Sequence, residues 1–244
     1  MMKVWIAAAL ALTVAACAPR GDDRDISRAP STTQPAPVAA VPAKPADAPA
    51  KAVSAARPRI AVLGDSLTAG LGVAKAASYP SRLQEKLDAA GLDFEVVNAG
   101  VSGDTSAGGL ARLDWALDGD VRVLIVALGG NDGLRGLPAA ELQANLAQIT
   151  ERAQARGITV ILAGMEAPPN YGRDYIVDFH MVYPALAAKY HVALVPFLLQ
   201  GVAGEETLNQ RDGIHPTAAG ARIVAGNVWA VLKPIVEARR RPNT

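Results

Sequence analysis

The sequence predicts a three-layer α/β/α domain around a central parallel β-sheet. From residue 59 onward, short apolar runs alternate with segments whose apolar residues recur at helical spacing. The short runs are apolar at successive positions, which is typical of parallel strands that helices bury on both faces. Residues 59–244 form a segment of natural size for a single domain.

The first half of this domain contains three predicted strands. Arg59–Leu63 is a buried strand that ends at a Gly-Asp-Ser turn, and a helix follows in which Pro80 suits the first turn and Gly91 ends the segment. Phe94–Val97 is predicted as the second strand. Val121–Leu128 is the most apolar run of the domain, so we expect it to be the central strand of the sheet.

The second half continues the alternation. Pro138–Arg156 has apolar residues at helical spacing and is predicted as a helix, and Ile158–Ala163 as another buried strand. Asp174–Tyr190 is predicted as a helix, Val192–Val195 as a short strand, and Pro216–Arg239 as a final amphipathic helix.

The N-terminal residues have the pattern of a secretion signal. Lys3 is followed by the apolar stretch Val4–Ala16, which is shorter than the roughly 20 residues that span a bilayer. Val14–Cys17 resembles a bacterial lipobox, in which the cysteine is lipidated and becomes the mature N-terminus. We therefore expect a signal peptide at residues 1–16, lipidation of Cys17, and a periplasm-facing lipid anchor in a bacterial cell envelope. The alternative is an ordinary signal peptide that contains a cysteine.

Residues 17–58 are predicted to form a tether between this anchor and the domain. Ala18–Pro58 is rich in alanine and proline and nearly lacks large apolar residues, so it cannot bury enough surface to offset the entropy of ordering. It either holds the domain away from the membrane or is a linker constrained only in length. Cys17 is the single cysteine, which excludes an intramolecular disulfide and a cysteine-based metal site.

The charge balance argues against a nucleic-acid partner. The chain has 24 Lys and Arg against 23 Asp and Glu, for a formal net charge of +1. Such a chain produces no strong positive field that would attract RNA or DNA.

Three chemistry-bearing residues follow three successive predicted strands. Ser66 follows the first strand, Gly103 lies in the glycine-rich loop after the second, and Asn131 follows the third. Ligands of open parallel sheets bind at the carboxyl ends of the strands, so we expect these residues to meet at one edge. Taken alone, Ser66 could simply cap the helix that follows it. Ser102, also in a strand-end loop, is a weaker candidate nucleophile.

Asp212 and His215 form a second pattern, in the loop before the last helix. A carboxylate three residues before a histidine can accept the Nδ1 proton, which leaves Nε2 free as a base. In isolation, an Asp-x-x-His sequence is more often a structural hydrogen bond. The other two histidines, His180 and His191, are expected at the surface or at a helix end.

Four motifs together resemble the SGNH (GDSL) hydrolase family. They occur in that family's order and approximate spacing: GDSL at 64–67, SGDT at 102–105, GGND at 129–132 and DGIHP at 212–216. The resemblance implies a flavodoxin-like fold and a serine hydrolase without metal or cofactor. It assigns Ser66 as nucleophile, His215 as general base and Asp212 as its orienting acid. It also implies an oxyanion hole formed by the Ser66 and Gly103 backbone N–H groups and the Asn131 side-chain amide.

The resemblance also suggests a substrate class. The stretches at 129–136 and 170–173 are similar to those of bacterial periplasmic enzymes with thioesterase, arylesterase and lysophospholipase activity. The implied substrate is a small-molecule acyl ester or thioester. Loops 134–137 and 167–173 are expected to flank an acyl groove because they lie at the same predicted sheet edge. The lipobox and the tether depart from those enzymes, which are soluble. Two alternatives are a carbohydrate O-deacetylase on the same scaffold and a non-catalytic ligand-binding module, which would leave the Asp212–His215 pair without a role.

Overall fold

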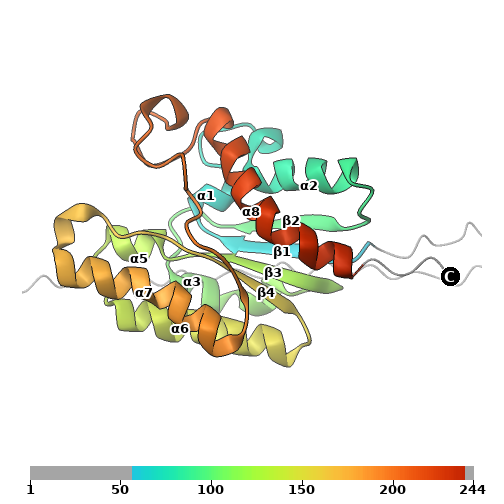
Figure 1. Ribbon diagram of the computed structural model, residues 1–244, viewed down its shortest axis with the longest axis horizontal. Helices are drawn as coiled ribbons and strands as arrows, with labels where there is room; N and C mark the ends of the chain where they lie inside the picture. The colour runs from blue at the N-terminus through green and yellow to red at the C-terminus, as the bar shows by residue number, and fades with distance from the viewer. Residues whose placement is uncertain (1–56, 240–244) are drawn as a thin grey trace, which may run out of the picture. The chain divides into compact units, whose positions relative to one another are not determined.

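The computed structural model describes residues 57–239 of the protein (Figure 1). The predicted signal peptide at 1–16, the lipidation site Cys17 and nearly all of the predicted tether at 17–58 lie outside the described residues. The predicted domain at 59–244 is described up to residue 239.

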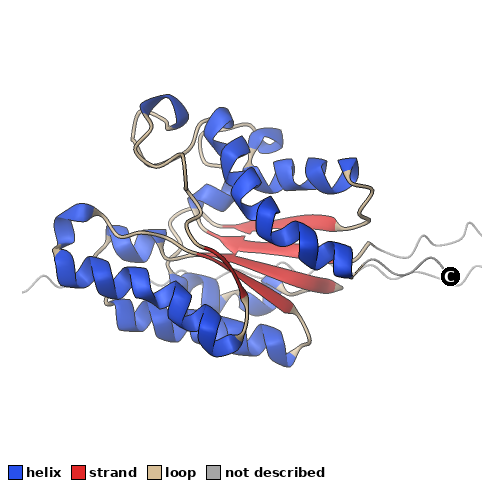
Figure 2. Cartoon of the chain, viewed as in Figure 1, coloured by secondary structure: helices blue, strands red, loops and turns tan. Residues whose placement is uncertain are grey.

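The core of the domain is one parallel sheet of five strands in the order β2-β1-β3-β4-β5. The strands are β1 (Arg59–Gly64), β2 (Glu95–Gly100), β3 (Val121–Ala127), β4 (Thr159–Ala163) and β5 (Ala193–Val195). Helices cover both faces of the sheet (Figure 2). The predicted three-layer α/β/α fold is therefore confirmed, and the strand order is that of flavodoxin-like proteins.

The helices divide into two layers. One face of the sheet carries α2 and α8, which pack against each other, and the other carries α3, α6 and α7 (Figure 1). The helices are α1 (Ser66–Ala69), α2 (Tyr79–Ala89), α3 (Ser106–Ala111), α4 (Leu113–Ala116), α5 (Gly130–Leu134), α6 (Ala139–Ala155), α7 (Arg173–Tyr190) and α8 (Ala218–Ala238). Short 3₁₀ turns lie at Lys75–Ala77, Pro169–Tyr171 and Glu206–Leu208.

The direction in which the chain adds strands reverses at β1. From β1 the chain moves outward to β2 and then returns to place β3 on the other side of β1. Gly64, the last residue of β1, pairs with Gly100 on β2 and with Ala127 on β3, so the three strands end level with one another. A crevice forms at such a reversal, and ligand sites of open α/β sheets lie there. The loops after β1, β2 and β3 therefore meet at this edge.

Burial explains why the apolar runs became strands. Ile60 through Leu63 on β1 and Val123 through Ile125 on β3 are fully buried between the helical layers. Helix α8 is long and apolar enough to cross a membrane by length and composition, but its face containing Val224, Val228 and Leu232 is buried in this core. Its apolar character is thus accounted for by packing within the domain.

The structure corrects one predicted strand and adds several short helices. The second strand is β2 (Glu95–Gly100) and not Phe94–Val97, because hydrogen bonding with β1 continues to Gly100. Asn98–Gly100 therefore belongs to the strand and not to the following loop. Gly100 packs directly on the backbone of α1, where a Cβ would lie 2.3 Å from the Ala69 nitrogen. Helices α3, α4 and α5 are too short to give a periodic apolar pattern.

Candidate active site

Ser66 is the first residue of α1 and lies just beyond the end of β1. Asp65 is the residue that caps this helix: its carboxylate accepts a hydrogen bond from the Leu67 N–H at 3.0 Å. The alternative in which Ser66 itself caps the helix is therefore ruled out. Because Asp65 caps the helix, the Ser66 hydroxyl is available to bond with the loop that carries His215, although Ser66 is only 9% exposed.

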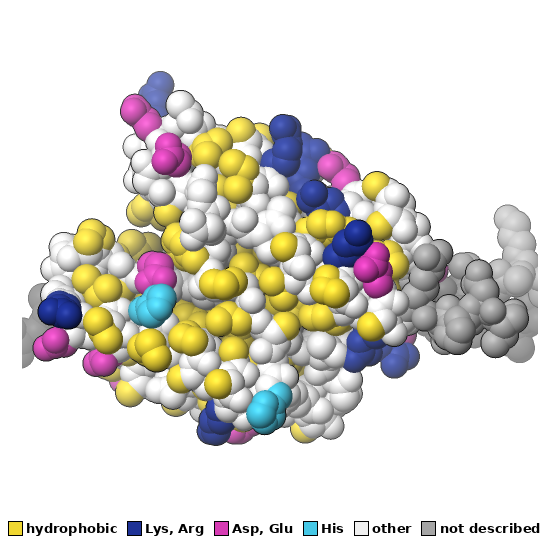
Figure 3. Space-filling view, in the orientation of Figure 1, with side chains coloured by type: hydrophobic (Ala, Val, Ile, Leu, Met, Phe, Trp, Pro, Cys, Tyr) yellow, Lys and Arg dark blue, Asp and Glu magenta, His cyan; other side chains and the backbone are white. Residues whose placement is uncertain are grey.

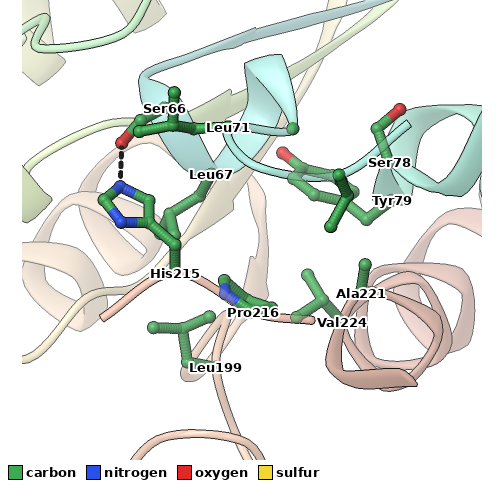
Figure 4. Close-up of a pocket in the computed structure, with 12 residues that line it drawn as sticks. Ser66, Leu67, Leu71, Ser78, Tyr79, Leu199, His215, Pro216, Ala221 and Val224 are labelled. Atoms are coloured by element: carbon green, nitrogen blue, oxygen red, sulfur yellow. Dashed lines mark hydrogen bonds between the residues drawn. The ribbon is translucent and has the colours of Figure 1, made fainter. Parts of the chain in front are cut away.

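The side chains of Ser66, His215 and Asp212 form a continuous hydrogen-bonded chain. His215 Nε2 lies 2.9 Å from Ser66 Oγ, and His215 Nδ1 lies 2.8 Å from Asp212 Oδ2. Figure 4 shows the Ser66 hydroxyl and the His215 ring facing each other at the mouth of a crevice that Leu71 and Leu199 also line. Residues separated by 149 positions in the sequence are thus in proton-transfer contact.

Asp212 is held ionised by the turn that contains it. Its second carboxylate oxygen accepts the N–H groups of Ile214 and His215 at 2.9 and 3.0 Å. These backbone hydrogen bonds, together with the one from the His215 ring, lower the pKa of the Asp212 carboxyl to about 2. An ionised carboxylate on Nδ1 fixes the tautomer in which Nε2 carries the lone pair.

Gln210 makes hydrogen bonds within the loop that carries His215 and from this loop to the segment after α1. Its backbone N–H donates to the His215 carbonyl at 2.7 Å, and its side-chain amide donates to the Leu71 carbonyl at 2.7 Å and to the Pro216 carbonyl at 3.1 Å. The neighbouring Gly72 has no side chain to displace this amide, and a Cβ there would lie 2.0 Å from Gln210 Oε1. Gln210 thus connects the segment after α1 to the loop that carries His215.

The other two predicted oxyanion donors lie on adjoining segments. Gly103 has a φ of +86°, a left-handed conformation that favours glycine, and its carbonyl accepts the Arg135 guanidinium at 2.8 Å. Asn131 lies in the first turn of α5, and its side-chain amide donates to the Asp104 carbonyl at 2.9 Å and to Asp65 Oδ2 at 3.3 Å. The segments that carry Ser66, Gly103 and Asn131 are therefore linked to one another.

Buried charged residues around these donors were not found from the sequence. Asp65 is 2% exposed, and burial raises the pKa of its carboxyl to about 6. Asp132 is equally buried and accepts both the backbone N–H and the hydroxyl of Ser106, at 2.8 and 2.5 Å. Arg112 bonds to two strand ends and to Asp104. The acids stand within the GDSL, SGDT and GGND motifs, but no sequence pattern singles out Arg112.

The other residues considered from the sequence lie apart from this chain of contacts. His180 is exposed and its Nδ1 lies 2.8 Å from Glu166, and His191 ends α7 in a left-handed conformation. Both agree with the predicted surface or helix-end positions. Ser102 is exposed in the loop after β2, and within residues 57–239 its hydroxyl has no hydrogen bond to an imidazole.

The two loops expected to flank an acyl groove contact each other. The Tyr171 hydroxyl donates to the Leu134 carbonyl at 2.8 Å. On α7, just after loop 167–173, the Tyr175 hydroxyl donates to the Leu137 carbonyl at 2.8 Å. Loop 134–137 follows α5 and Asn131, so both loops adjoin the oxyanion side of the site. In the described part of the chain, no group of three or more His, Cys, Asp or Glu side chains is arranged to hold a metal ion.

Comparisons with known proteins agree with this geometry. The model of the GDSL-like Lipase/Acylhydrolase family matches residues 62–223. Esterase TesA of Pseudomonas aeruginosa is 49% identical over 183 residues, covering 75% of this chain and 91% of that protein. The Thioesterase 1/protease 1/lysophospholipase L1 of Escherichia coli K12 is 38% identical over 184 residues, covering 75% of this chain and 87% of its own.

The chain belongs to the GDSL-like lipase/acylhydrolase family. The crystal structure of TesA superposes with a TM-score of 0.70 at 48% identity, covering 72% of this chain and 99% of that one. Membership of the GDSL family explains why the four motifs, which are far apart in sequence, converge on one sheet edge. It also makes this protein a hydrolase of ester bonds.

Proposed function

We propose that this protein hydrolyses carboxylic esters and thioesters through an acyl-enzyme on Ser66. The observation that carries the proposal is the unbroken contact from Ser66 Oγ through the His215 ring to Asp212, with distances of 2.9 and 2.8 Å. A serine hydroxyl is a weak nucleophile unless a base removes its proton, and this arrangement supplies the base and the group that orients it.

In the acylation half-reaction, His215 acts first as a general base and then as a general acid. His215 Nε2 accepts the Ser66 proton while Ser66 Oγ attacks the carbonyl carbon of the substrate. The negative charge that develops on the carbonyl oxygen is stabilised by the Ser66 and Gly103 N–H groups and the Asn131 amide. Asp212 stabilises the imidazolium. As the tetrahedral intermediate collapses, the bond to the leaving group breaks and His215 gives its proton to the departing alcohol or thiol.

Deacylation repeats the sequence with water. His215 accepts a proton from a water molecule, whose oxygen attacks the acyl-Ser66 carbonyl carbon. The same donors stabilise the second oxyanion. Collapse of this intermediate returns the proton to Ser66 Oγ and releases the carboxylic acid, which restores the free enzyme.

The surroundings of Ser66 favour an acyl chain over a carbohydrate. Five exposed apolar side chains, each at least 40% accessible, come from the segments that adjoin the site: Leu71, Val101, Leu134, Tyr171 and Ile214. Exposed apolar side chains on the segments around a site favour apolar ligands over polar ones. They support acyl esters as the substrate class and weigh against the alternative carbohydrate O-deacetylase.

We further propose that the enzyme acts at the bacterial cell envelope, anchored through a lipid on Cys17 and facing the periplasm. The support is the short apolar stretch before Cys17 and the alanine- and proline-rich segment after it. In a bacterial host, the wild-type protein should fractionate with membranes and Cys17→Ser should lose this association. Equal membrane association of both proteins would contradict lipid anchoring.

A hydrolysis assay tests the proposed chemistry. Wild-type protein should hydrolyse p-nitrophenyl esters, and Ser66→Ala should lower turnover by about a million-fold, as in other serine triads. A panel of acetyl to palmitoyl esters, acyl thioesters, lysophospholipid and acetylated sugars then ranks the substrates. Near wild-type turnover by Ser66→Ala would exclude Ser66 as the nucleophile, and activity confined to acetylated sugars would favour the deacetylase alternative.

A further inference from the structure

The three oxyanion donors stand on three separate segments, and the sheet alone does not fix their separation. The register of β1 with β2 and β3 ends at Gly64, Gly100 and Ala127. Ser66, Gly103 and Asn131 all lie two to four residues beyond those ends. Between the first two segments, the backbone adds one further hydrogen bond, from the Val101 N–H to the Gly64 carbonyl. A side chain that bridges these segments would therefore set the geometry of the hole.

We propose that Arg112 is a positioning residue that sets the geometry of the oxyanion hole. The inference rests on the proposed ester hydrolysis at Ser66 and assigns a further residue to that same site. Arg112 ends α3, and its guanidinium group contacts all three strand-end segments, two directly and the third through Asp104.

All three nitrogens of the planar Arg112 guanidinium donate hydrogen bonds. Nη2 donates to the Gly64 carbonyl at 2.8 Å, two residues before Ser66, and Nη1 donates to the Ala99 carbonyl at 2.7 Å, near the end of β2. Nε donates to the Asp104 carboxylate at 2.5 Å, next to Gly103. The three acceptors thus hold one rigid group in a single orientation, which a lysine cannot reproduce.

Asp104 extends this bridge to the third donor. Its carboxylate accepts Arg112, and its backbone carbonyl accepts the Asn131 side-chain amide at 2.9 Å. The orientation of the Asn131 amide therefore depends on where Arg112 holds Asp104. The same residue fixes the start of the Gly103 loop, because its N–H donates to the Val101 carbonyl at 3.1 Å.

Burial and charge balance favour a positional role over a long-range electrostatic one. The Arg112 and Asp104 side chains are 18% and 19% exposed and neutralise each other. On its outer side the guanidinium lies 6.0 Å from the centre of the Trp115 ring. The pair contributes little net charge to the site, so its effect on the reaction should come through the placement of the hydrogen-bond donors.

Steady-state kinetics of Arg112→Met and Arg112→Lys test the proposal. Oxyanion donors act in the transition state, so kcat should fall about 10- to 100-fold while KM changes less than about threefold. Arg112→Lys keeps the charge but loses the planar guanidinium, and it should lose at least about tenfold in kcat. The matched control is Arg152→Met, which breaks an exposed ion pair to Asp114, with 45% and 78% exposed side chains, and should stay within about twofold of wild type.

A second measurement separates positioning from simple destabilisation. Butylboronic acid forms a tetrahedral adduct on a serine hydroxyl, so its affinity for folded Arg112→Lys should fall by about the same factor as kcat/KM. Circular dichroism under assay conditions gives the folded fraction used for normalisation. The proposal is overturned if normalised kcat stays within twofold of wild type, or if boronate affinity is unchanged while kcat falls. A wild-type protein without esterase activity would instead refute the proposed function itself.

Discussion

The segments that carry Ser66, Gly103 and Asn131, the proposed nucleophile and oxyanion donors, are held together by residues distant in the sequence. The proposed base His215 and its acid Asp212 instead lie on a loop held mostly by its own turn. In the first group of segments, Asp65 and Asp132 are each 2% exposed, and Arg112 bonds to Gly64, 48 residues away. In the loop, the Asp212 side chain is 45% exposed, and it binds the N–H groups of the next residues. The space-filling view shows a hollow between the part of the surface over α5 and α7 and the part formed by the loop before α8 (Figure 3).

This difference matches what each group of residues would do in the proposed reaction. The oxyanion hole must hold its donors in place before charge develops, because preorganised dipoles stabilise a transition state without the cost of reorganisation. The histidine moves a proton between Ser66, the leaving group and water, and it needs only a fixed tautomer and short contacts. The proposed oxyanion donors therefore need contacts from distant residues, while a local turn is sufficient for the base.

After loss of Ser66, the largest decrease in kcat should come from loss of an oxyanion donor. Asn131→Ala removes one oxyanion donor, and it should lower kcat by about a hundred- to thousand-fold, with little change in KM. The loss also leaves Asp65 and the Asp104 carbonyl without their shared amide partner. Steady-state kinetics on a p-nitrophenyl ester measures the effect. A loss below about fivefold would mean that the amide is not an oxyanion donor.

Asp65, the buried acid beside Asn131, should make the free energy of unfolding depend on pH. The pKa of Asp65 is about 6 in the folded protein, above its ordinary value of 3.8, because burial disfavours the charged form. Between these values the folded protein binds a proton that the unfolded chain releases, so the free energy of unfolding falls as pH rises from about 4 to 6. A shift of this size corresponds to ~3 kcal/mol.

Urea unfolding of wild type and Asp65→Asn at pH 4, 5, 6 and 7 checks this prediction. Asparagine does not ionise, so the stability of wild type relative to the variant should decline between pH 4 and 6 and level off toward pH 7. A stability difference that stays constant across this range would contradict a buried titrating carboxyl at Asp65. The comparison cancels the carboxyl groups common to both proteins.

The smallest decrease in kcat should come from a change in the loop that carries Asp212 and His215. Gln210→Ala removes the amide that ties the His215 loop to Leu71, and we expect kcat to fall about tenfold, since a displaced base misaligns proton transfer. The control is Gln148→Ala on α6, whose amide makes only a long, exposed hydrogen bond to Ala144. If Gln210→Ala and Gln148→Ala have equal kcat, the turn around Asp212 is enough to hold the base.

The two groups of residues also differ in how far the sequence predicts them. The Asp212–His215 contact was predictable because its partners are three residues apart and the turn is local. The alternation of buried strands and helices was predictable because apolar runs follow burial. The end of β2 and the short helices α3 to α5 were not, because pairing with β1 and packing against α1 extend the strand where the sequence reads as a glycine-rich loop.

Arg112 and Asp65 show why the contacts that hold the strand-end segments together could not be predicted from the sequence. The partners of Arg112 are the carbonyls of Gly64 and Ala99, and backbone carbonyls carry no sequence signal. Asp65 reads as part of a turn motif until the structure shows it buried beside Asn131. Sequence patterns identify residues whose chemistry is distinctive, whereas residues that position them become visible only through tertiary contacts.

Covalent labelling tests the central claim most directly. A fluorophosphonate reacts with a serine hydroxyl that a neighbouring base activates, so peptide mapping after labelling reveals the nucleophile itself. The account predicts one phosphonylated residue, Ser66, with labelling abolished in Ser66→Ala and strongly slowed in His215→Ala, but unchanged in Ser102→Ala. Modification at Ser102, or undiminished labelling of Ser66→Ala, would contradict the account.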